Sequence, residues 1–523
     1  MKKEIEKIID AALEGLGLDK PKYVVEHPTD LKMGDYSTNV GIITGKAKEI
    51  VEALKKAEPS FEIELAGPGF INFRLLKSFF AQSLGEIIEK GESFGQGQHA
   101  KGLKVIVEYT DANPFKQLHI GHLMSNAVGE AVSRIIEWNG AEVKRANYQG
   151  DAGIHIAQAV YGMMKGATDP YAFGNKAFNE SEEAQSEIKE INKKIYDKSD
   201  SQINDLYTKG REESLRNFEE VYEKLGTKFD FYFFESETAP IGKKIVEENI
   251  GKVFELSDGA TVFHAEKYDP SLHTRVFINS QGIPTYEAKD LGNAKNKFDK
   301  YPYDLSVVVT GNEIKDYFRV MLKALEQIYP DLAKKTKHIP HGMLRLPTGK
   351  MSSRTGDVIT AEALIEEVKE KVKGDEQVAV GAIKYMILRS NIGSDIIFDI
   401  EKSVSTEGDS GVYLQYAHAR AHSLLEKAGK KGNVEGERAH NHEIEKLLYR
   451  FPEIVERAGA EYAPNFIVTY LTELAASFNN FYAHEPVLEE SPESAYRLAI
   501  VEAFKIVMKN GLNILGIPAP ERM

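Results

Sequence analysis

The chain has 523 residues, and because one hydrophobic core rarely serves so long a chain, we expect several domains. Its 66 Lys and Arg residues against 80 Asp and Glu residues give a net charge of -14, which argues against non-specific coating of nucleic acid but leaves binding through local basic patches open. The chain has no cysteine, which excludes disulfides, thiol nucleophiles and cysteine zinc sites and makes a cytoplasmic location the default, and no run approaches the ~18 apolar residues that cross a membrane.

The first elements along the chain predict a small α+β domain over residues 1–98. Acidic residues interrupt the apolar positions of residues 1–17, so we expect an amphipathic helix there and no signal peptide. A second helical pattern follows, and the segment FEIELAGPGFINFRL then alternates like two strands around the turn Gly67-Pro68-Gly69.

The next predicted domain, residues 99–345, has the pattern of a Rossmann-type, doubly wound parallel sheet. Lys104–Thr110 is a β-branched run suited to a buried parallel strand, and the helical pattern that follows stops at Asn139-Gly140. The segment EVKRANYQGD predicts a second strand and completes a βαβ unit. Farther along, composition predicts a mostly helical insertion over 165–260, a connecting segment over 346–400 and an all-α domain over 401–523.

Two histidines, His119 and His122, lie where the helix of the βαβ unit should begin. An isolated pair at this spacing is usually structural, and a zinc site would need a third ligand that the segment does not offer. A strand that ends in a loop and opens a helix favours a different ligand, because the free backbone N–H groups of a helix start attract phosphate. Gly121, between the histidines, would let a base or ribose approach the backbone. The context therefore favours a nucleotide site.

A second motif lies far downstream in LPTGKMSSRTGDVIT. It contains Lys350, Met351, Ser352, Ser353 and Arg354 between two glycines, in a segment expected to be a loop. Together, the sequences HIGH and KMSSR resemble the two signature motifs of class I aminoacyl-tRNA synthetases.

Longer segments narrow this resemblance to the arginyl-tRNA synthetases. They are VEYTDANPFKQLHIGH, YQGDAGIH, TYEAKDLGNA, GVYLQYAHARAHSLL and the C-terminal RLAIVEAFKIVMKNGLNILGIPAPERM, together with an N-terminal GDYSTNV…AGPGFINFRL that is similar to the family's RNA-binding extension. The resemblance runs from near residue 1 to Met523 in the family's domain order. It implies that residues 99–345 form the catalytic domain and residues 401–523 the anticodon-binding domain.

The resemblance also implies a pocket for L-arginine. A guanidinium is a permanent planar cation with five donors, and it needs a carboxylate partner. Asp290 matches the family residue that pairs with the guanidinium, and Tyr286, one helix turn away, adds a hydroxyl and an aromatic face. Asn113 matches the asparagine that holds the α-amino end of the substrate. Glu108 and Asp111 are further positions at the same pocket.

ATP and Mg²⁺ are the other small molecules that the resemblance implies. His119, His122, Lys350 and the residues around them would contact ATP, and Mg²⁺ would arrive with the nucleotide, while no metal site formed by the protein alone is expected. Lys116 is an additional candidate at the phosphates, because some family members without the loop lysine carry one just before HIGH. The sequence does not decide between Lys116 and Lys350.

tRNA(Arg) is the implied macromolecular partner, and a monomer is the family's usual state. In GVYLQYAHARAHSLL several side chains could stack on or hydrogen-bond to unpaired bases. Those matched to this role are Tyr413, Gln415, Tyr416 and Arg420, with His418 and His422 nearby.

Several positions near the substrate depart from the family's pattern. Ala152 replaces a tryptophan found in part of the family, and His155 replaces a usual glutamine. Asn312 and Glu313 replace a glutamine-containing stretch, and Asp111 stands where a small hydroxyl residue is usual. Asp111 and Glu313 keep the neighbourhood anionic, which suits a cationic substrate.

Three alternatives remain open on the sequence. One is a synthetase for another amino acid, against which the pair of Tyr286 and Asp290 argues. Another is a non-catalytic tRNA-binding paralogue, which would have no need of His119, His122 and Lys350. The third is a simple nucleotidyltransferase, which would leave the helical C-terminal region without a purpose.

Overall fold

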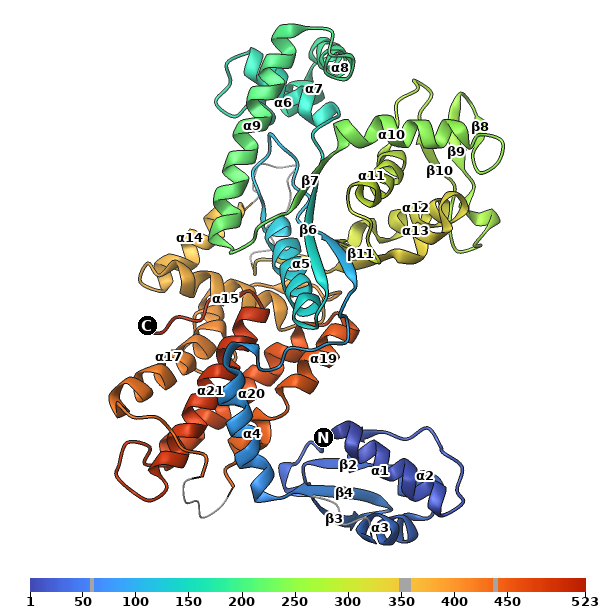
Figure 1. Ribbon diagram of the computed structural model, residues 1–523. Helices are drawn as coiled ribbons and strands as arrows, with labels where there is room; N and C mark the ends of the chain where they lie inside the picture. The colour runs from blue at the N-terminus through green and yellow to red at the C-terminus, as the bar shows by residue number, and fades with distance from the viewer. Residues whose placement is uncertain (57–60, 348–358, 436–440) are drawn as a thin grey trace.

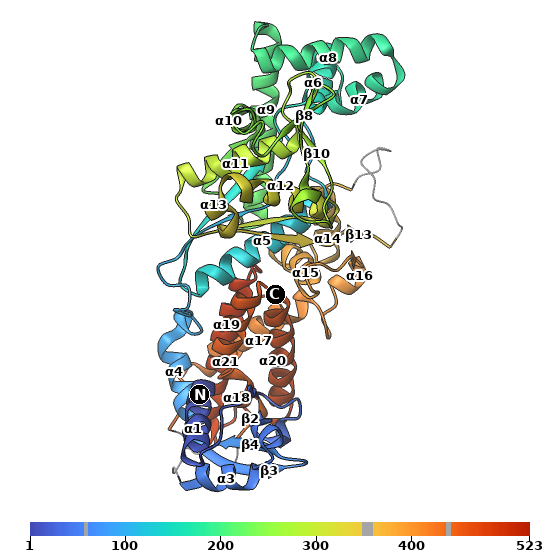
Figure 2. The ribbon, with the colours of Figure 1, turned by 90° about the vertical axis from the view of Figure 1, so that its right-hand side faces the viewer.

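The computed structural model describes residues 1–56, 61–347, 359–435 and 441–523. The molecule is elongated, with the helical insertion at one end and the N-terminal unit at the other (Figures 1 and 2). The predicted architecture is confirmed: an α+β unit, a domain built on a parallel sheet and a helical unit follow one another along the chain. The exact domain boundaries stay a prediction.

The N-terminal unit packs helices on an antiparallel sheet of order β1-β2-β4-β3. Ile63, Ile71 and Phe73 alternate into its core, as the sequence pattern predicted. Its elements are α1 (Lys2–Gly15), β1 (Val25–Glu26), η1 (Leu31–Met33), β2 (Tyr36–Thr38), α2 (Val40–Thr44), α3 (Ala47–Lys56), β3 (Phe61–Ala66) and β4 (Phe70–Leu75). Helix α4 (Lys77–Lys90) and η2 (Gly91–Ser93) then lead to the sheet domain along helix α21 (Ser494–Ile514) (Figure 1).

The parallel sheet has the strand order β12-β11-β5-β6-β7. Its strands are β5 (Lys104–Glu108), β6 (Glu142–Gln149), β7 (Phe231–Phe234), β11 (Leu305–Gly311) and β12 (Thr336–His341), all paired in parallel. The chain runs outward from β5 in one direction and then restarts at β11 on its other side. The carboxyl ends of β5 and β11 therefore frame the crevice in which doubly wound sheets bind ligands.

Both faces of the sheet are covered by apolar side chains. Val105 and Val107 of β5 belong to a core on the side of helix α5 (Ile120–Trp138), whereas Ile106 belongs to a core on the opposite side. The opposite core includes residues of α10 (Glu235–Glu248), α11 (Tyr286–Lys300) and α12 (Lys315–Ile328), with α13 (Pro330–Lys335) and η4 (Asn312–Ile314) beside them.

The span 165–260 contains more than the predicted helices. Helices α6 (Ile154–Met164), α7 (Pro170–Glu180), α8 (Glu182–Asp197) and α9 (Ser201–Lys224) leave the sheet after β6 and share a small core of their own. Strand β7 then returns to the parallel sheet from within the span assigned to the insertion. A second, antiparallel sheet of β8 (Glu255–Ser257), β9 (Ala260–Phe263) and β10 (Arg275–Ile278) follows, with η3 (Ala265–Lys267) between its strands.

The C-terminal helices share one continuous core with helix α5 of the sheet domain. A short parallel pair, β13 (Leu344–Arg345) and β14 (Ile396–Ile397), brackets α14 (Ala361–Lys371) and α15 (Glu376–Leu388). The remaining helices are α16 (Ile400–Ser403), α17 (Gly411–Ala428), α18 (Glu443–Leu448), α19 (Phe451–Glu461), α20 (Asn465–His484) and α21. A shared core of this kind fixes the helical unit relative to the sheet.

Candidate active site

Helix α5 begins with a reciprocal cap made by the two histidines. The Nδ1 atom of His119 accepts a hydrogen bond from the backbone N–H of Gly121 at 3.0 Å, and Nδ1 of His122 accepts one from the N–H of His119 at 3.1 Å. The two rings are stacked, with centroids 3.7 Å apart. Because a backbone N–H only donates, both Nδ1 atoms must be unprotonated, and each neutral ring therefore carries its proton on Nε2. Two ring N–H donors thus stand at a positive helix end.

Both histidines are neutral at pH 7. Burial lowers the pKa of His119, and the charge of Lys116 lowers it further. The pKa of His122 lies well below its usual value because of burial, and then because of His119 and Lys116. The Lys116 ammonium lies 4.5 Å from the ring centroid of Tyr171 in helix α7, so the insertion contacts the loop before the histidines. The arrangement combines neutral donors with one nearby cation, which suits phosphate.

Lys350, Met351, Ser352 and Ser353 lie outside the described residues. The described residues that follow them are joined to the start of α5: the N–H of Ile120 donates to the carbonyl of Ile359, and the N–H of Ala361 donates to the carbonyl of Leu118. The fold thus places Ile359–Ala361, which follow the second motif in the sequence, against the HIGH motif at the start of α5.

A cluster of carboxylates lies at the carboxyl ends of the strands beside the histidines. Glu108, the last residue of β5, accepts from Lys297 at 2.8 Å and from Asn293 at 2.9 Å. Asp111 accepts from the backbone N–H of Tyr148 at 2.9 Å. The cluster is completed by Asp290, which accepts from the hydroxyl of Tyr317, and by Glu235, which pairs with Lys289 at 2.6 Å.

The cluster contains more carboxyl groups than ammonium groups. Four carboxyl groups stand against two ammonium groups, those of Lys289 and Lys297, each already paired. Burial raises the pKa of Asp290 to about 7 against the lowering hydrogen bond from Tyr317, and the charges of Glu108 and Glu235 raise it further. Burial and then Glu108 hold the pKa of Asp111 well above its usual value. A bound cation would relieve this repulsion, so the pocket suits a positively charged ligand.

The predicted pair on α11 has the expected spacing but unequal exposure. Tyr286, the first residue of the helix, is 59% exposed, and the Lys289 ammonium lies 5.0 Å from its ring centroid. Asp290 lies deeper, in hydrogen-bond contact with Tyr317. An aromatic side chain at the rim and a carboxylate below it suit a long cationic side chain.

The loop between β5 and α5 is held in a strained conformation. The backbone φ values of Thr110, Asp111 and Phe115 are 77°, 48° and 67°, in a region that residues other than glycine rarely adopt. The hydroxyl of Ser125 accepts from the backbone N–H of Thr110 at 3.0 Å, and the amide of Asn126 donates to the hydroxyl of Thr110 at 3.1 Å. Such strain persists only where the surroundings enforce it, and it is concentrated at functional sites.

Asn113 lies directly over the backbone of Gly150. A Cβ atom at residue 150 would come within 2.0 Å of the Asn113 amide oxygen, so only glycine permits this contact. The two positions that depart from the family in the same segment have ordinary structural roles. Ala152 is buried, and His155 hydrogen-bonds through Nε2 to the carbonyl of Gly150 at 3.0 Å. Burial, and then Lys116, lower the pKa of His155 to about 4.

Sequence reasoning missed several members of the cluster. Lys289 and Asn293 lie inside the quoted segment TYEAKDLGNA, where their spacing from Asp290 marks neighbouring faces of one helix. Lys297 lies one turn after Asn293 on the same helix, whereas Glu235 and Tyr317 come from α10 and α12 and have no local sequence signal. Asn312 and Glu313 are exposed in η4, immediately after β11.

The C-terminal unit presents an aromatic and cationic surface on α17 and α20. The guanidinium of Arg420 lies 4.7 Å from the ring centroid of Tyr416 and 5.4 Å from that of Tyr482, and both tyrosines are exposed. Asn479 links Arg420 to the hydroxyl of Tyr413.

The other polar residues matched on α17 point into the protein or lie at its edge. Gln415 is fully buried and donates to the carbonyls of Gln377 and Pro518. His418 is buried as well and donates through Nδ1 to the carbonyl of Pro520. Their side chains brace the C-terminal segment, so we leave Gln415 out of the surface that faces RNA.

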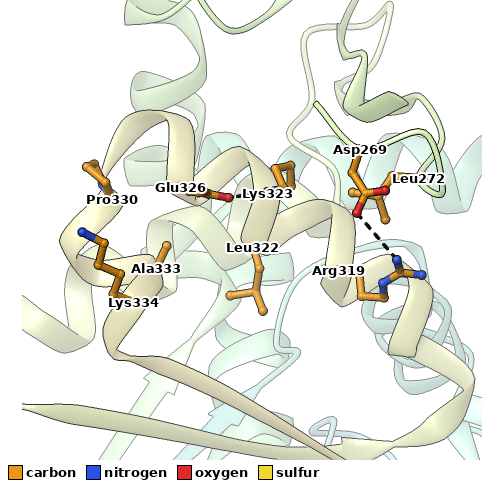
Figure 3. A pocket seen from close by; sticks show the side chains of 9 residues that line it. All are labelled: Asp269, Leu272, Arg319, Leu322, Lys323, Glu326, Pro330, Ala333 and Lys334. Carbon is orange, nitrogen blue, oxygen red and sulfur yellow. Dashed lines mark hydrogen bonds and ion pairs between the residues drawn. The ribbon is translucent and has the colours of Figure 1, made fainter. Parts of the chain in front are cut away.

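A hollow of about 380 Å³ lies apart from these residues, between α12, α13 and the loop around Leu272 (Figure 3). Its rim carries the ion pairs Arg319–Asp269 at 3.9 Å and Lys323–Glu326 at 2.5 Å. It includes none of the predicted site residues, and Arg319 and Lys323 in its lining are already paired.

Among the described residues, no group of three or more histidine and acidic side chains is arranged to hold a metal ion. In the same described ranges, no helix is both long enough and apolar enough to cross a membrane.

Comparison with known proteins gives consistent matches over the whole chain. Residues 83–400 match the model of tRNA synthetases class I (R), catalytic domain, residues 3–75 that of the arginyl tRNA synthetase N terminal domain, and residues 414–523 that of the DALR anticodon binding domain. The arginine–tRNA ligase of Treponema pallidum is 31% identical over 85% of this chain and 83% of its own length. That of Oenococcus oeni is 30% identical over 99% of both chains.

Solved structures agree with these sequence matches. The arginyl-tRNA synthetase of Thermus thermophilus superposes with a TM-score of 0.82 at 25% identity and covers 100% of both chains. The arginyl-tRNA synthetase of Plasmodium falciparum gives a TM-score of 0.79 at 20% identity over 100% of this chain and 99% of its own, which shows a common fold.

Proposed function

The chain belongs to the class I arginyl-tRNA synthetases, and from that premise we propose how its residues carry out the reaction. Its activity is that of an arginine–tRNA ligase, which attaches L-arginine to tRNA through an arginyl-adenylate and releases AMP and pyrophosphate. The observation that supports the assignment of roles is the excess of buried carboxylates beside two neutral imidazole donors at one crevice of the sheet.

In the first step the arginine carboxylate attacks the α-phosphorus of ATP. A bond forms between the carboxylate oxygen and phosphorus, the bond to the bridging oxygen breaks, and pyrophosphate leaves with the electron pair. No proton needs to be transferred, so the protein has to align the groups and stabilise charge on the phosphates. The Nε2–H groups of His119 and His122 donate to phosphate oxygens, and Gly121 gives the nucleotide access to the backbone. Lys116 and Lys350 supply positive charge, and Met351, Ser352 and Ser353 line the nucleotide.

The arginine itself is held at both ends. Asp290 pairs with the guanidinium, Glu108 keeps the pocket anionic, and Asp111 adds negative charge once the cation is bound. Tyr286 covers the side chain, and Asn113 accepts from the α-amino group. In the second step a ribose hydroxyl at the end of the tRNA attacks the activated carbonyl carbon and loses its proton, the bond from that carbon to the phosphate oxygen breaks, and AMP leaves with the electron pair. Mg²⁺, bound through the ATP phosphates, would neutralise part of their charge.

We further propose a monomeric, cytoplasmic enzyme that requires tRNA(Arg) before it activates arginine. The test is arginine-dependent exchange of pyrophosphate into ATP, measured with and without tRNA. Exchange that needs both arginine and tRNA supports the proposal. Full exchange without tRNA would refute the requirement, and tight tRNA binding without any exchange would favour a non-catalytic paralogue.

The raised pKa of Asp290 predicts a pH dependence of arginine use. A carboxyl group with a pKa of about 7 is partly protonated in the free enzyme near neutrality, whereas the guanidinium pairs with its ionised form. We therefore expect kcat/KM for arginine to fall as the pH is lowered from 8 through about 7 to 6. Burial lowers the pKa values of both histidines, which moves their protonation toward lower pH than that of Asp290. Steady-state exchange kinetics across these pH values would check this, and a flat profile would contradict it.

The aromatic surface on α17 predicts a separate effect on tRNA. Replacing Tyr416 or Arg420 with alanine removes a stacking partner, and stacking of one base contributes about 1–3 kcal/mol. We expect kcat/KM for tRNA to fall about tenfold or more in aminoacylation, with KM for arginine unchanged. Lys427→Ala removes an exposed charge from the last turn of the same helix and serves as control. Equal losses in control and test variants would point to a general charge effect.

A further inference from the structure

A buried lysine lies where three parts of the chain meet. Lys384 of α15 is fully buried, and its ammonium donates to the carbonyl of Leu225 at 2.6 Å and to the carbonyl of Gly516 at 2.8 Å. Leu225 ends helix α9 of the insertion, and Gly516 follows the end of α21. As a hydrogen-bond donor, the Lys384 amine therefore joins two helix ends from distant parts of the sequence. Burial, and then the charge of Arg134, lower the pKa of Lys384 to about 7.

Arg134 of α5 repeats the same bridge beside Lys384. Its guanidinium donates to the carbonyl of Gly226 at 3.0 Å and to the carbonyl of Asn513 at 3.1 Å, and its Nε donates to Glu130 at 2.6 Å. Gly516 has φ 65°, and a Cβ atom there would lie 3.0 Å from the Lys384 ammonium and 3.5 Å from Nε of Arg134. The left-handed turn after α21 is therefore fitted closely against the Lys384 amine and the Arg134 guanidinium.

Glu130 carries these contacts to the reaction loop. It is buried and accepts from Arg134, from Arg145 at 3.0 Å and from the hydroxyl of Tyr109 at 2.5 Å. Burial raises the pKa of Glu130, but the charges of Arg134 and Arg145 outweigh it and keep the group ionised. Tyr109 immediately precedes Thr110 and Asp111, the residues in the strained conformation, and its ring packs on Gly129 and Phe229.

On its other side the same C-terminal segment is attached to α17. Gln415 donates to the carbonyl of Pro518, and His418 donates to the carbonyl of Pro520. Residues 516–520 thus lie between the helix that bears Tyr416 and Arg420 and the neighbouring side chains of Lys384 and Arg134, of which Arg134 contacts Glu130. An unbroken series of hydrogen bonds, ion pairs and short chain segments joins the two sites.

We propose that Lys384 is a positioning residue, which transmits the placement of α17 through residues 516–520, Arg134 and Glu130 to the loop that begins at Tyr109. This inference rests on the proposed roles of α17 in binding tRNA and of the loop in binding arginine. Lys384 touches neither substrate, and its effect is on the geometry of Asp111 and its neighbours when tRNA is bound.

The test compares Lys384→Met with wild type in aminoacylation. Coupling residues of this kind change rates by between about 2-fold and about 30-fold. We expect kcat to fall about tenfold, while KM for ATP and arginine and Kd for tRNA stay within about twofold of wild type. Lys509→Met is the control, because it removes a lysine from α21 that forms an exposed pair with Glu92 and lies outside the series. A change in KM or Kd with kcat unaltered would overturn the proposal.

A double-variant cycle separates positioning from simple loss of structure. If Lys384 transmits the placement of α17 to the loop, Arg420→Ala lowers kcat in the wild-type background but has little further effect on kcat in the Lys384→Met background. Additive losses would overturn the proposal.

Tyr109→Phe supplies a second variant should Lys384→Met unfold, because it removes one hydroxyl and keeps the ring packing. We expect it to lower kcat and to be non-additive with Arg420→Ala as well, and additive losses here would also overturn the proposal. Failure of wild type to charge tRNA would refute the proposed function, whereas normal charging by both variants would refute this inference alone.

Discussion

Asp290→Asn should abolish most arginine-dependent activity, lowering kcat/KM for arginine by at least about 100-fold. The substitution keeps the size of the side chain and its contact with Tyr317 but removes the charge that the guanidinium needs. Removing one partner of a buried ion pair costs about 3–5 kcal/mol, and each ~1.4 kcal/mol corresponds to a tenfold change in rate.

Two comparisons show whether this loss arises in the pocket. Asp299→Asn lies on the same helix, in an exposed pair with Lys295, and should leave the kinetics unchanged. Wild type should reject citrulline, the neutral isostere of arginine. The Asp290→Asn variant should show a smaller ratio of kcat/KM for arginine to kcat/KM for citrulline. Pyrophosphate exchange with both amino acids measures this, and unchanged discrimination in the variant would remove Asp290 from the pocket.

Because both histidines carry their proton on Nε2, replacing either with asparagine should lower kcat more than replacing it with glutamine. Asparagine places its amide near the position of Nδ1, which only caps the helix, whereas glutamine reaches the position of Nε2, where the proposed donor lies. We expect His119→Asn or His122→Asn to lower kcat by about 100-fold to about 1,000-fold, the loss typical of one donor to a developing charge. Glutamine at either position should recover about tenfold of this loss.

Single-turnover formation of the adenylate is the appropriate measurement, since it isolates the step at the phosphates. In thermal unfolding the asparagine variants should be more stable than the glutamine variants, because asparagine preserves the helix cap and a cap contributes about 1 kcal/mol. Faster adenylate formation by the asparagine variants than by the glutamine variants would place Nδ1, and not Nε2, at the phosphates.

The site was partly predictable from the sequence because its first elements are local. A β-branched strand, a loop and a helix that starts at His119 and ends near Asn139 follow from patterns within about 40 residues. The carboxylate cluster was only half visible. Glu235 reaches it from α10, and Lys297 from two turns farther along α11 than Asp290; the pairing of Glu235 with Lys289 and of Lys297 with Glu108 depends on tertiary contacts that no local pattern encodes.

Two further differences between the sequence prediction and the structure also arise from tertiary contacts. Phe231–Phe234 is an aromatic run with high strand propensity, but it lies between highly charged helices and was included in the insertion, although it pairs with β6. Gln415 was matched to a role in binding RNA, yet its side chain is buried, and its amide nitrogen donates to the carbonyls of Gln377 and Pro518. Polar residues are assigned to the surface by default, and only the fold reveals their partners.

The most direct test of the account is charging of tRNA by the wild-type protein, with each of the 20 amino acids supplied separately with ATP. The excess of carboxylates at Asp290, Asp111, Glu108 and Glu235 predicts that arginine alone is attached, with one AMP and one pyrophosphate released for each arginyl-tRNA formed. Attachment of a different amino acid, or tRNA binding without charging by arginine, would contradict the account.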